Sequence, residues 1–191
     1  MKILLFVTLG ILGLLSLAYF RFVKVVLAGK IIDPETGASL FYLPDTFPWN
    51  LWYEGRSITL LLPLLGITIF AAWDDQLPRK PRSTYRVMVN HEWFGHAVQL
   101  RDDGYVFYPR YTFSKQWRWR YETEAFVESI KTAYELGLLY RTSDNKRVGP
   151  LFHFARCLSE QYRLGRKYDF SLCYKELSER TQDFKTTFPH V

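Results

Sequence analysis

The hydrophobic positions of the chain are concentrated in two uncharged runs near its N-terminus. Residues 3–20 carry no charged side chain and are bracketed by Lys2 and Arg21. A run of about 18 apolar residues is long enough to cross a bilayer as a helix. The second run, Ser57–Trp73, is also uncharged and lies near the lower limit of that length. The pattern therefore predicts a membrane-anchoring region in residues 1–76, with candidate spans at 3–20 and 57–73 that form a hairpin.

Each run also fits another kind of segment. A signal peptide contains an apolar run too, and Ser16-Leu17-Ala18 resembles the small-x-small site at which signal peptides are cleaved. In the second run, Pro63 and Gly66 weaken a lipid-exposed helix, so a buried helix or a re-entrant segment is the alternative. Aromatic residues flank this run as an interfacial belt would: Trp49, Trp52, Tyr53 and Trp73.

Basic residues near the two runs give a marginal preference for one orientation. Positive charge collects on the cytoplasmic side of a membrane. One more Lys or Arg lies outside the two runs than between them, which weakly favours a cytoplasmic position for both ends of the chain. The residues compared are Arg21, Lys24, Lys30 and Arg56 between the runs, and Lys2, Arg79, Lys80, Arg82 and Arg86 outside them.

Residues 77–191 have the apolar spacing of amphipathic helices. The basic segment Pro78–Arg82 predicts a linker before them, because its prolines interrupt a helix. Helices are expected from Ser83 or Thr84 to about Leu100, from Tyr121 to Tyr140, from Pro150 to about Leu164 and from Phe170 to Phe184, with an extended segment at Tyr105–Phe113. The predicted fold class is mainly α: an N-terminal membrane hairpin followed by a small helical domain.

The first of these helices contains the stretch with the clearest chemistry, His91-Glu92-Trp93-Phe94-Gly95-His96. Two of the chain's four histidines lie here, and a Glu follows the first of them. Imidazole is a common ligand of zinc, and a neighbouring Glu can act as general base for a metal-bound water. The zinc-protease signature H-E-x-x-H has one residue fewer between its histidines. The stretch therefore indicates a metal site, provided that the backbone absorbs the additional residue.

The spacing of the two histidines sets a geometric condition. On a regular α-helix, the histidines of H-E-x-x-H lie about 40° apart, whereas His91 and His96 would lie about 140° apart. A π-bulge absorbs one additional residue, and such bulges are frequent at functional sites. Gly95 makes the backbone more permissive at this point. We therefore expect a bulge near Gly95, whereas an unbroken α-helix would leave two unrelated histidines.

Two families have motifs that resemble this region. His91-Glu92-Trp93-Phe94-Gly95-His96 resembles the H-E-L-L-G-H motif of the dipeptidyl-peptidase III family of zinc peptidases, over six residues and not over the large fold of that family. The wider stretch 91–130 is similar to small gluzincin-type proteins, which carry H-E-x-x-H-x-x-Q followed by E-x-E-A. Here His96-Ala97-Val98-Gln99 and Glu122-Thr123-Glu124-Ala125 correspond to the last two parts. The resemblance implies a zincin-like domain.

The third metal ligand is expected in the second of these segments, because a catalytic zinc has three protein ligands and an open fourth position. Alignment with E-x-E-A puts the ligand at Glu122 and the small Ala125 against the first helix. Alignment with a ligand Glu that is followed four residues later by an acid puts it at Glu124, with Glu128 behind it. Glu122 is the preferred ligand, and Glu124 is the alternate.

The charge of the chain bears on its partners. The net charge is +6 and the pI is about 9.3. Basic and aromatic residues alternate in one cluster, Lys115, Trp117, Arg118, Trp119 and Arg120. Beside a membrane anchor, such a cluster favours anionic lipid headgroups over nucleic acid, and no nucleic-acid partner is expected. The two cysteines, Cys157 and Cys173, are compatible with free thiols or with a pair.

Together these features predict a membrane-anchored, zinc-dependent hydrolase, a metallopeptidase that acts on a peptide or protein substrate. His91, His96 and Glu122 (alternatively Glu124) would bind Zn²⁺, and Glu92 would be the catalytic base. The domain would occupy residues 77–191. The rival hypothesis is a non-catalytic membrane-bound structural or interaction protein whose metal site is structural or decayed, which a fourth protein ligand would favour.

Overall fold

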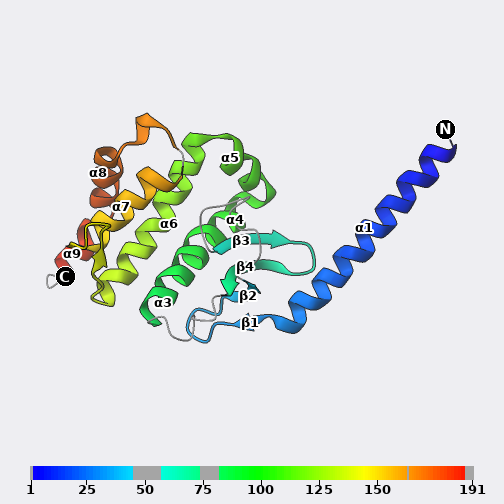
Figure 1. The fold of residues 1–191 in the computed structure, drawn as a ribbon, viewed down its shortest axis with the longest axis horizontal. Helices are drawn as coiled ribbons and strands as arrows, with labels where there is room; N and C mark the ends of the chain where they lie inside the picture. The colour runs from blue at the N-terminus through cyan, green and yellow to red at the C-terminus, as the bar shows by residue number, and fades with distance from the viewer. Residues whose placement is uncertain (1, 45–56, 74–81, 163, 188–191) are drawn as a thin grey trace.

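The computed structural model describes residues 2–44, 57–73, 82–162 and 164–187. Its N-terminal helix α1, Lys2–Gly29, extends as a long arm from the rest of the molecule, with the N-terminus at the far end (Figure 1). By length and composition α1 could cross a membrane, and it is the one helix in the described part of the chain of which this is true. Its outer part exposes apolar side chains such as Leu14 and Leu15, whereas Val23 and Val26 near its C-terminal end are buried.

A four-stranded sheet follows α1. Its strands are β1 (Ile31–Ile32), β2 (Ser39–Pro44), β3 (Ser57–Leu62) and β4 (Gly66–Trp73), in the order β1-β2-β4-β3. β2 and β4 are parallel, and the other two pairs are antiparallel. β3 is therefore an edge strand, which matters because it is the strand nearest to the candidate site.

The prediction of a second membrane-spanning helix at Ser57–Trp73 is wrong, because these residues form the β3–β4 hairpin. Pro63 lies in the turn, and Gly66 begins β4 with a φ of 68°, a conformation that favours glycine. Both faces of the hairpin pack against other elements, so its strands read as one continuous apolar run rather than as an alternating pattern. Hydropathy alone does not distinguish such strands from a short span.

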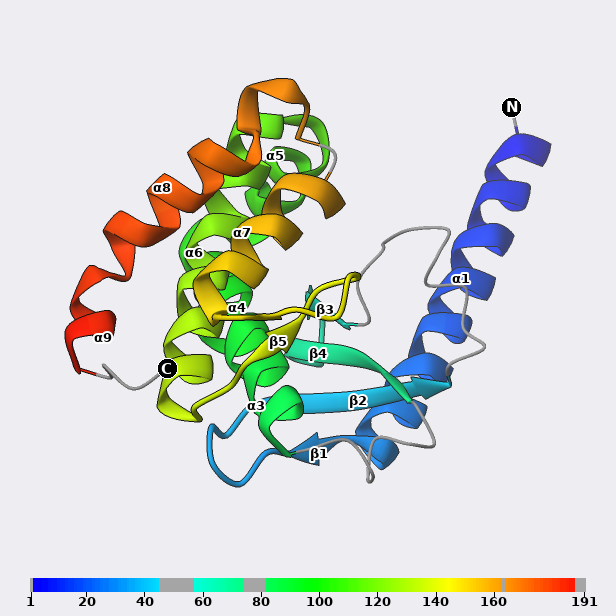
Figure 2. The ribbon, with the colours of Figure 1, turned by 60° about the vertical axis from the view of Figure 1, so that its left-hand side comes forward.

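The sheet lies between α1 and the first of the C-terminal helices (Figure 2). On one face, Phe70 and Leu65 pack with Val23 and Val26 of α1. On the other face, Ile69 and residues of β2 pack with Val89 of α3. This second face of the sheet therefore packs next to the segment that contains the histidine motif. The boundary predicted between residues 76 and 77, the proposed linker except for Arg82, and Trp49, Trp52 and Tyr53 lie outside the described residues.

The remaining chain is mostly helical, as predicted. The elements are α3 (Arg82–Asn90), the π-helical segment η2 (His91–His96), α4 (Ala97–Asp103), η3 (Gly104–Val106), α5 (Phe107–Phe113), α6 (Lys115–Glu135), the short strands β5 (Tyr140–Arg141) and β6 (Arg147–Val148), α7 (Pro150–Gln161), η4 (Arg166–Tyr168), α8 (Phe170–Arg180) and α9 (Gln182–Thr187). The extended segment expected at Tyr105–Phe113 is wrong: α5 occupies most of it, with Pro109 in the first turn, where a helix tolerates proline.

Helix α6 is central to the helical layer and packs against η2 and α3 on one side and α7 and α8 on another (Figure 1). The helix is capped by the preceding residue, Ser114, whose hydroxyl accepts a hydrogen bond from the backbone N–H of Trp117. The largest apolar core, which includes Phe126 and Ile130 of α6, fills the space between α6, α7 and α8. α6 thereby joins the core to the candidate site.

Candidate metal centre

The histidine motif lies in a π-helical segment, as its spacing predicted. His91 and His96 are the first and last residues of η2, and their ring centroids are 5.0 Å apart. A π-helix bonds each residue to the fifth along, so the wider turn brings residues five apart to the same face. The predicted bulge is confirmed, and the additional residue in H-E-x-x-x-H does not separate the two imidazoles.

Gly95 allows η2 to approach α6 closely. A Cβ atom added at Gly95 would lie 2.5 Å from the Cβ of Ala125, closer than real Cβ contacts allow. Both positions therefore need small residues. Ala125 lies against the histidine-bearing segment η2, as the sequence predicted. Because Glu122 precedes Ala125 by about one turn of α6, this close approach carries the Glu122 carboxylate to the histidines.

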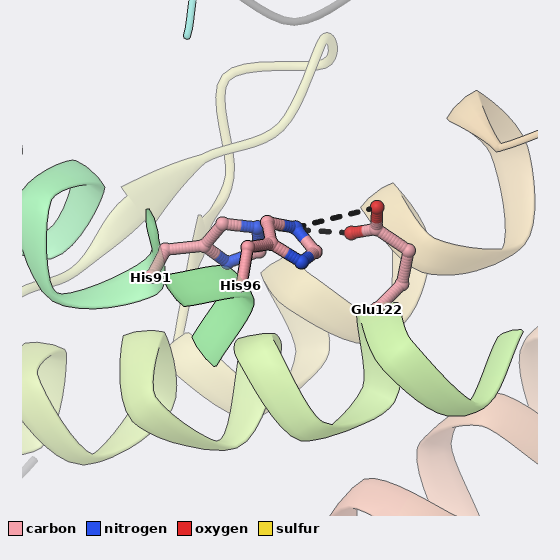
Figure 3. Close-up of side chains that lie close together, drawn as sticks. All are labelled: His91, His96 and Glu122. Carbon is pink, nitrogen blue, oxygen red and sulfur yellow. Dashed lines mark ion pairs between the residues drawn. The ribbon is translucent and has the colours of Figure 1, made fainter. Parts of the chain in front are cut away.

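The side chains of His91, His96 and Glu122 form a buried group that could hold a metal ion (Figure 3). The His91 Nε2 atom is 3.7 Å from Glu122 Oε2, and the His96 Nε2 atom is 3.5 Å from Glu122 Oε1. Two ligands at zinc distances of about 2.0–2.2 Å and at a tetrahedral angle are about 3.3–3.6 Å apart. These separations therefore suit one ion between the three side chains.

The other nitrogen of each imidazole has a partner of its own. His91 Nδ1 is 3.0 Å from the Ser129 hydroxyl, and His96 Nδ1 is 2.9 Å from the Gln99 side-chain carbonyl. A carbonyl oxygen only accepts, so His96 donates from Nδ1 and directs the lone pair of Nε2 toward Glu122. Partners of this kind orient metal-binding histidines and select their tautomer.

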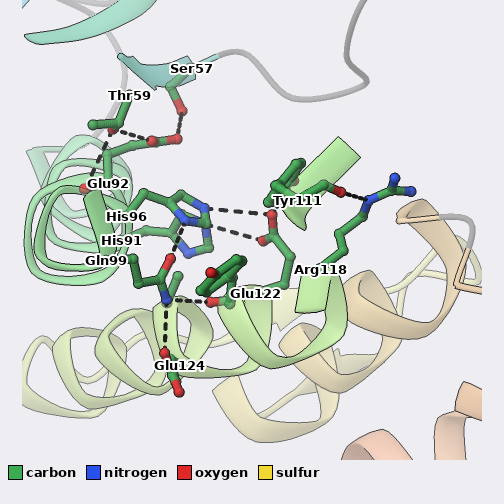
Figure 4. A network of polar contacts seen from close by, with 12 residues as sticks. Ser57, Thr59, His91, Glu92, His96, Gln99, Tyr111, Arg118, Glu122 and Glu124 are labelled. Carbon is green, nitrogen blue, oxygen red and sulfur yellow. Dashed lines mark hydrogen bonds and ion pairs between the residues drawn. The ribbon is translucent and has the colours of Figure 1, made fainter. Parts of the chain in front are cut away.

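The Gln99 amide is itself held in one orientation (Figure 4). Its Nε2 donates to the backbone carbonyl of Tyr121, at 2.9 Å, and to the Glu124 carboxylate, at 3.1 Å. Both partners are acceptors, so a flipped amide would lose both bonds. The structure thus brings Glu122 to the histidines and places the alternate residue, Glu124, behind Gln99, where it also pairs with Arg120.

The charge of the buried group depends on its neighbours. Burial by itself would raise the pKa of Glu122, but His96, His91 and a hydrogen bond from Tyr111 outweigh it and hold that pKa below its usual value. Burial would lower the pKa of His91, but the Glu122 carboxylate, 3.7 Å from His91 Nε2, outweighs that and raises it. A fully buried, ionised carboxylate requires a positive charge beside it, which a bound cation or a protonated imidazole supplies.

Glu92 does not point at this group. Its carboxylate accepts hydrogen bonds from the Ser57 hydroxyl at 2.7 Å and from the Thr59 hydroxyl at 2.6 Å, both on β3 (Figure 4). Its charge nevertheless contributes to the raised pKa of His91. A cavity of about 290 Å³ adjoins both Glu92 and His96, so the proposed base and one ligand share an open space.

The sequence did not point to four residues of this network. Ser57 and Thr59 lie in the run for which a membrane span was predicted, Tyr111 lies in the segment that was expected to be extended, and no motif included Ser129. The hydroxyl of Tyr111 donates to Glu122 Oε1. Arg118 Nε donates to the backbone carbonyl of Tyr111 at 2.9 Å and helps to fix this part of α5. The available signal for Ser57 and Thr59 was that two hydroxyl-bearing residues stand two positions apart, which in a strand places both on the same face.

The basic-aromatic cluster does not form one exposed surface. Arg118 binds backbone carbonyls of α5, Arg120 pairs with Glu124, and Trp119 packs on Tyr168 at the apolar core. The two cysteines are free thiols, and burial, as the largest cause, raises the pKa of Cys157 and of Cys173 to about 11. A thiol with a pKa this high is mostly protonated at neutral pH.

No protein-family model, curated protein or solved structure matches the chain. The geometry of the buried group and of the cavity beside it is therefore the basis for assigning a function.

Proposed function

We propose that the chain is a membrane-anchored zinc-dependent hydrolase with a zincin-like domain, and that it cleaves peptide bonds. The observation that carries the proposal is the buried group of His91, His96 and Glu122, at 3.5–3.7 Å between the facing nitrogen and oxygen atoms, beside a cavity that Glu92 also lines. Three protein ligands and an accessible space are typical of a catalytic zinc site rather than of a structural one.

The donor set supports zinc. Two imidazoles and one carboxylate are the ligands of a large class of zinc hydrolases, and each imidazole here has an oriented partner on its other nitrogen. When bound, the ion supplies Lewis acidity and a water molecule whose pKa is lowered toward neutrality. Other first-row ions also accept these ligands, so the metal panel described below is part of the test.

The residues around the ion have separate tasks in this proposal. Glu92 accepts a proton during hydrolysis, because it is the carboxylate of the cavity that is not a ligand. Ser57 and Thr59 hold its carboxylate by donating to it and leave each oxygen with further acceptor capacity. Gln99 and Ser129 keep the imidazoles in the binding tautomer, and Tyr111 holds the Glu122 carboxylate.

The membrane is the second element of the proposal. α1 serves as a single anchor in lipid, since its outer part exposes apolar side chains over most of its length. With one span, three basic residues, Arg21, Lys24 and Lys30, closely follow the apolar run 3–20, which favours a cytoplasmic domain. The partners are then membrane lipid and a peptide or protein substrate.

One observation favours the rival, non-catalytic function. The Glu92 carboxylate is bonded to two hydroxyl groups of β3, and these bonds would also suit a Glu that only ties the sheet to η2. A structural role and a catalytic role for Glu92 make different predictions for activity and for stability, so one set of variants separates them.

The decisive experiment measures metal content and peptide hydrolysis on the same purified full-length protein, with Zn²⁺, Fe²⁺ and Mn²⁺ each supplied to the metal-free form. We expect about one equivalent of zinc in the wild type and in Glu92→Gln, with hydrolysis reduced by about 10²–10⁴-fold in the variant, because an amide does not accept the proton. Glu122→Gln and His91→Ala should lose both metal and activity. Loss of zinc from Glu92→Gln, or a zinc-loaded wild type that cleaves no peptide in a diverse mixture, would contradict the proposal.

A further inference from the structure

The cavity beside the metal-binding group has walls from three elements. It has a volume of about 290 Å³ and lies between β3, η2 and α5. This volume is at the lower end of the range for ligand sites, about 300–1,000 Å³, and it suits one side chain with its adjoining backbone. The lining residues are Ser57, Ile58, Thr59, Leu60, Glu92, His96, Phe107, Tyr108, Tyr111 and Thr112.

The chemistry of the lining is mostly apolar. Among the described residues, Glu92 is the one acidic side chain in the wall, and its carboxylate already accepts two hydrogen bonds from β3. Aromatic rings from α5, those of Phe107, Tyr108 and Tyr111, make up much of the remainder. A wall of this kind favours an uncharged, apolar group, because its burial removes apolar surface from water on both sides.

The aromatic wall is held in place before any ligand binds. The Leu61 backbone N–H donates to the Tyr108 hydroxyl at 2.6 Å, which ties α5 to the edge strand β3. The Phe107 ring stacks on Tyr111, at 5.5 Å between centroids, and contacts Tyr121 of α6 at 4.8 Å. Since these rings are packed against the body of the domain, little conformational entropy is lost when the cavity is filled.

We propose that this cavity binds an uncharged apolar side chain of the peptide substrate, of leucine or phenylalanine type, next to the bond that is cleaved. The inference rests on the proposed metallopeptidase function, and it adds a substrate class to it. The position of the cavity carries the argument: it adjoins both His96, a metal-binding residue, and Glu92, the proposed base. A side chain in the cavity therefore belongs to a residue whose backbone lies near the metal-binding group.

Binding of N-acetylated amino-acid hydroxamates to the zinc-loaded, full-length protein in lipid nanodiscs tests this without any need for turnover. The hydroxamate group binds the metal, and the side chain then probes the cavity. We expect the leucine derivative to bind about 10–100-fold more tightly than the glycine derivative, which is the range for burial of one large apolar side chain. The aspartate derivative should bind no more tightly than the glycine derivative.

A pair of substitutions at the end of α5 locates the effect. Thr112 is exposed and lines the cavity, whereas its neighbour Phe113 is exposed and does not. Thr112→Arg should reduce the preference for leucine over aspartate by about tenfold or more, because a cation in the wall attracts the carboxylate. Phe113→Arg adds the same charge one residue away and should leave the preference unchanged, so it controls for long-range electrostatics.

The outcomes distinguish this inference from the proposed function. If the glycine derivative binds but leucine confers no advantage, or if Thr112→Arg and Phe113→Arg give the same preference, the cavity does not receive the side chain and the inference is overturned. If zinc is bound but no hydroxamate binds, the metal has no open position and the proposed hydrolase function fails as well.

Discussion

The two buried faces of α6 differ in chemistry, although one helix carries both. The face toward η2 and α3 carries Glu122, Ala125, Ser129 and Thr132, and each of them contacts a residue of the preceding segment. The face toward α7 and α8 carries apolar residues such as Ile130. We will call these the polar face and the apolar face of α6.

The contacts on the polar face follow one helical row. Glu122 faces both histidines, and Ala125 faces Gly95. Ser129 faces His91, and Thr132 accepts a hydrogen bond at 2.8 Å from the side chain of Asn90. The spacing of three and four residues puts these four residues on one side of the helix. Small and hydrogen-bonding residues allow a close approach but bury little apolar surface. The polar face therefore orients the side chains of the candidate metal centre, and we expect the apolar face, which buries more apolar surface, to contribute more to stability.

Substitution of one residue on each face by alanine should separate the two roles most clearly. Ile130→Ala should lower the free energy of unfolding by about 2–5 kcal/mol, because Ile130 is fully buried in the largest core, and should leave zinc affinity of the folded protein unchanged. Chemical denaturation and competition with a zinc chelator measure the two quantities.

Its neighbour is the matched control. Ser129→Ala should weaken zinc binding by about 10–100-fold, because His91 loses the partner of its Nδ1 atom, and should change the stability of the metal-free protein far less than Ile130→Ala does. Equal effects of both substitutions on zinc affinity would mean that the two faces are not functionally distinct.

The close approach of η2 and α6 gives a second test. Gly95→Ala should destabilise the fold by about 1–3 kcal/mol, because the new methyl group meets Ala125. It should also weaken zinc binding, since the two helices must move apart. Ala125→Gly in the same chain should restore part of both losses, as a double-mutant cycle would show. Additive effects of the two changes would contradict direct contact between these positions.

Gln99 and Glu124 have different roles in the hydrogen-bond network beside the polar face. Gln99→Leu should weaken zinc binding by about 10–100-fold, because His96 Nδ1 then loses its acceptor. Glu124→Gln should have a smaller effect, since Glu124 contacts Gln99 and not the histidines. The reverse order, measured with the same chelator, would identify Glu124 as a ligand.

The smallest effect on stability is expected from substitution of His153, which lies on α7. Burial lowers the pKa of His153 below its usual value, as does the charge of Arg156. The unfolded chain then binds this proton more readily, so the stability contributed by neutral His153 is present above about pH 6.5 and is lost as the pH falls below it. His153→Phe keeps a ring to stack on Tyr140. Denaturation at pH 7 and pH 5 should show a smaller acid-induced loss of stability in this variant, and an unchanged loss would contradict the assignment.

Local chemistry was sufficient to predict much of the molecule. Five residue steps between His91 and His96 are incompatible with a shared face on a regular helix, so the sequence implied the π-helical segment once both were taken as ligands. The helices that begin at Pro150 and Phe170 also followed from the spacing of apolar residues and, for the first, from the proline in its first turn. These features depend on contacts within a few residues.

Other features depended on which surfaces meet in three dimensions. The run Ser57–Trp73 became a hairpin because β4 pairs with β2, and both of its faces are covered by other elements, which hydropathy does not report. Glu122 and Glu124 are equivalent by composition, and the contact between Gly95 and Ala125 decided which of them meets the histidines. Ser57, Thr59 and Tyr111 joined the site for the same reason: hydrogen bonds between residues distant in the chain form only after the sheet and helices have packed.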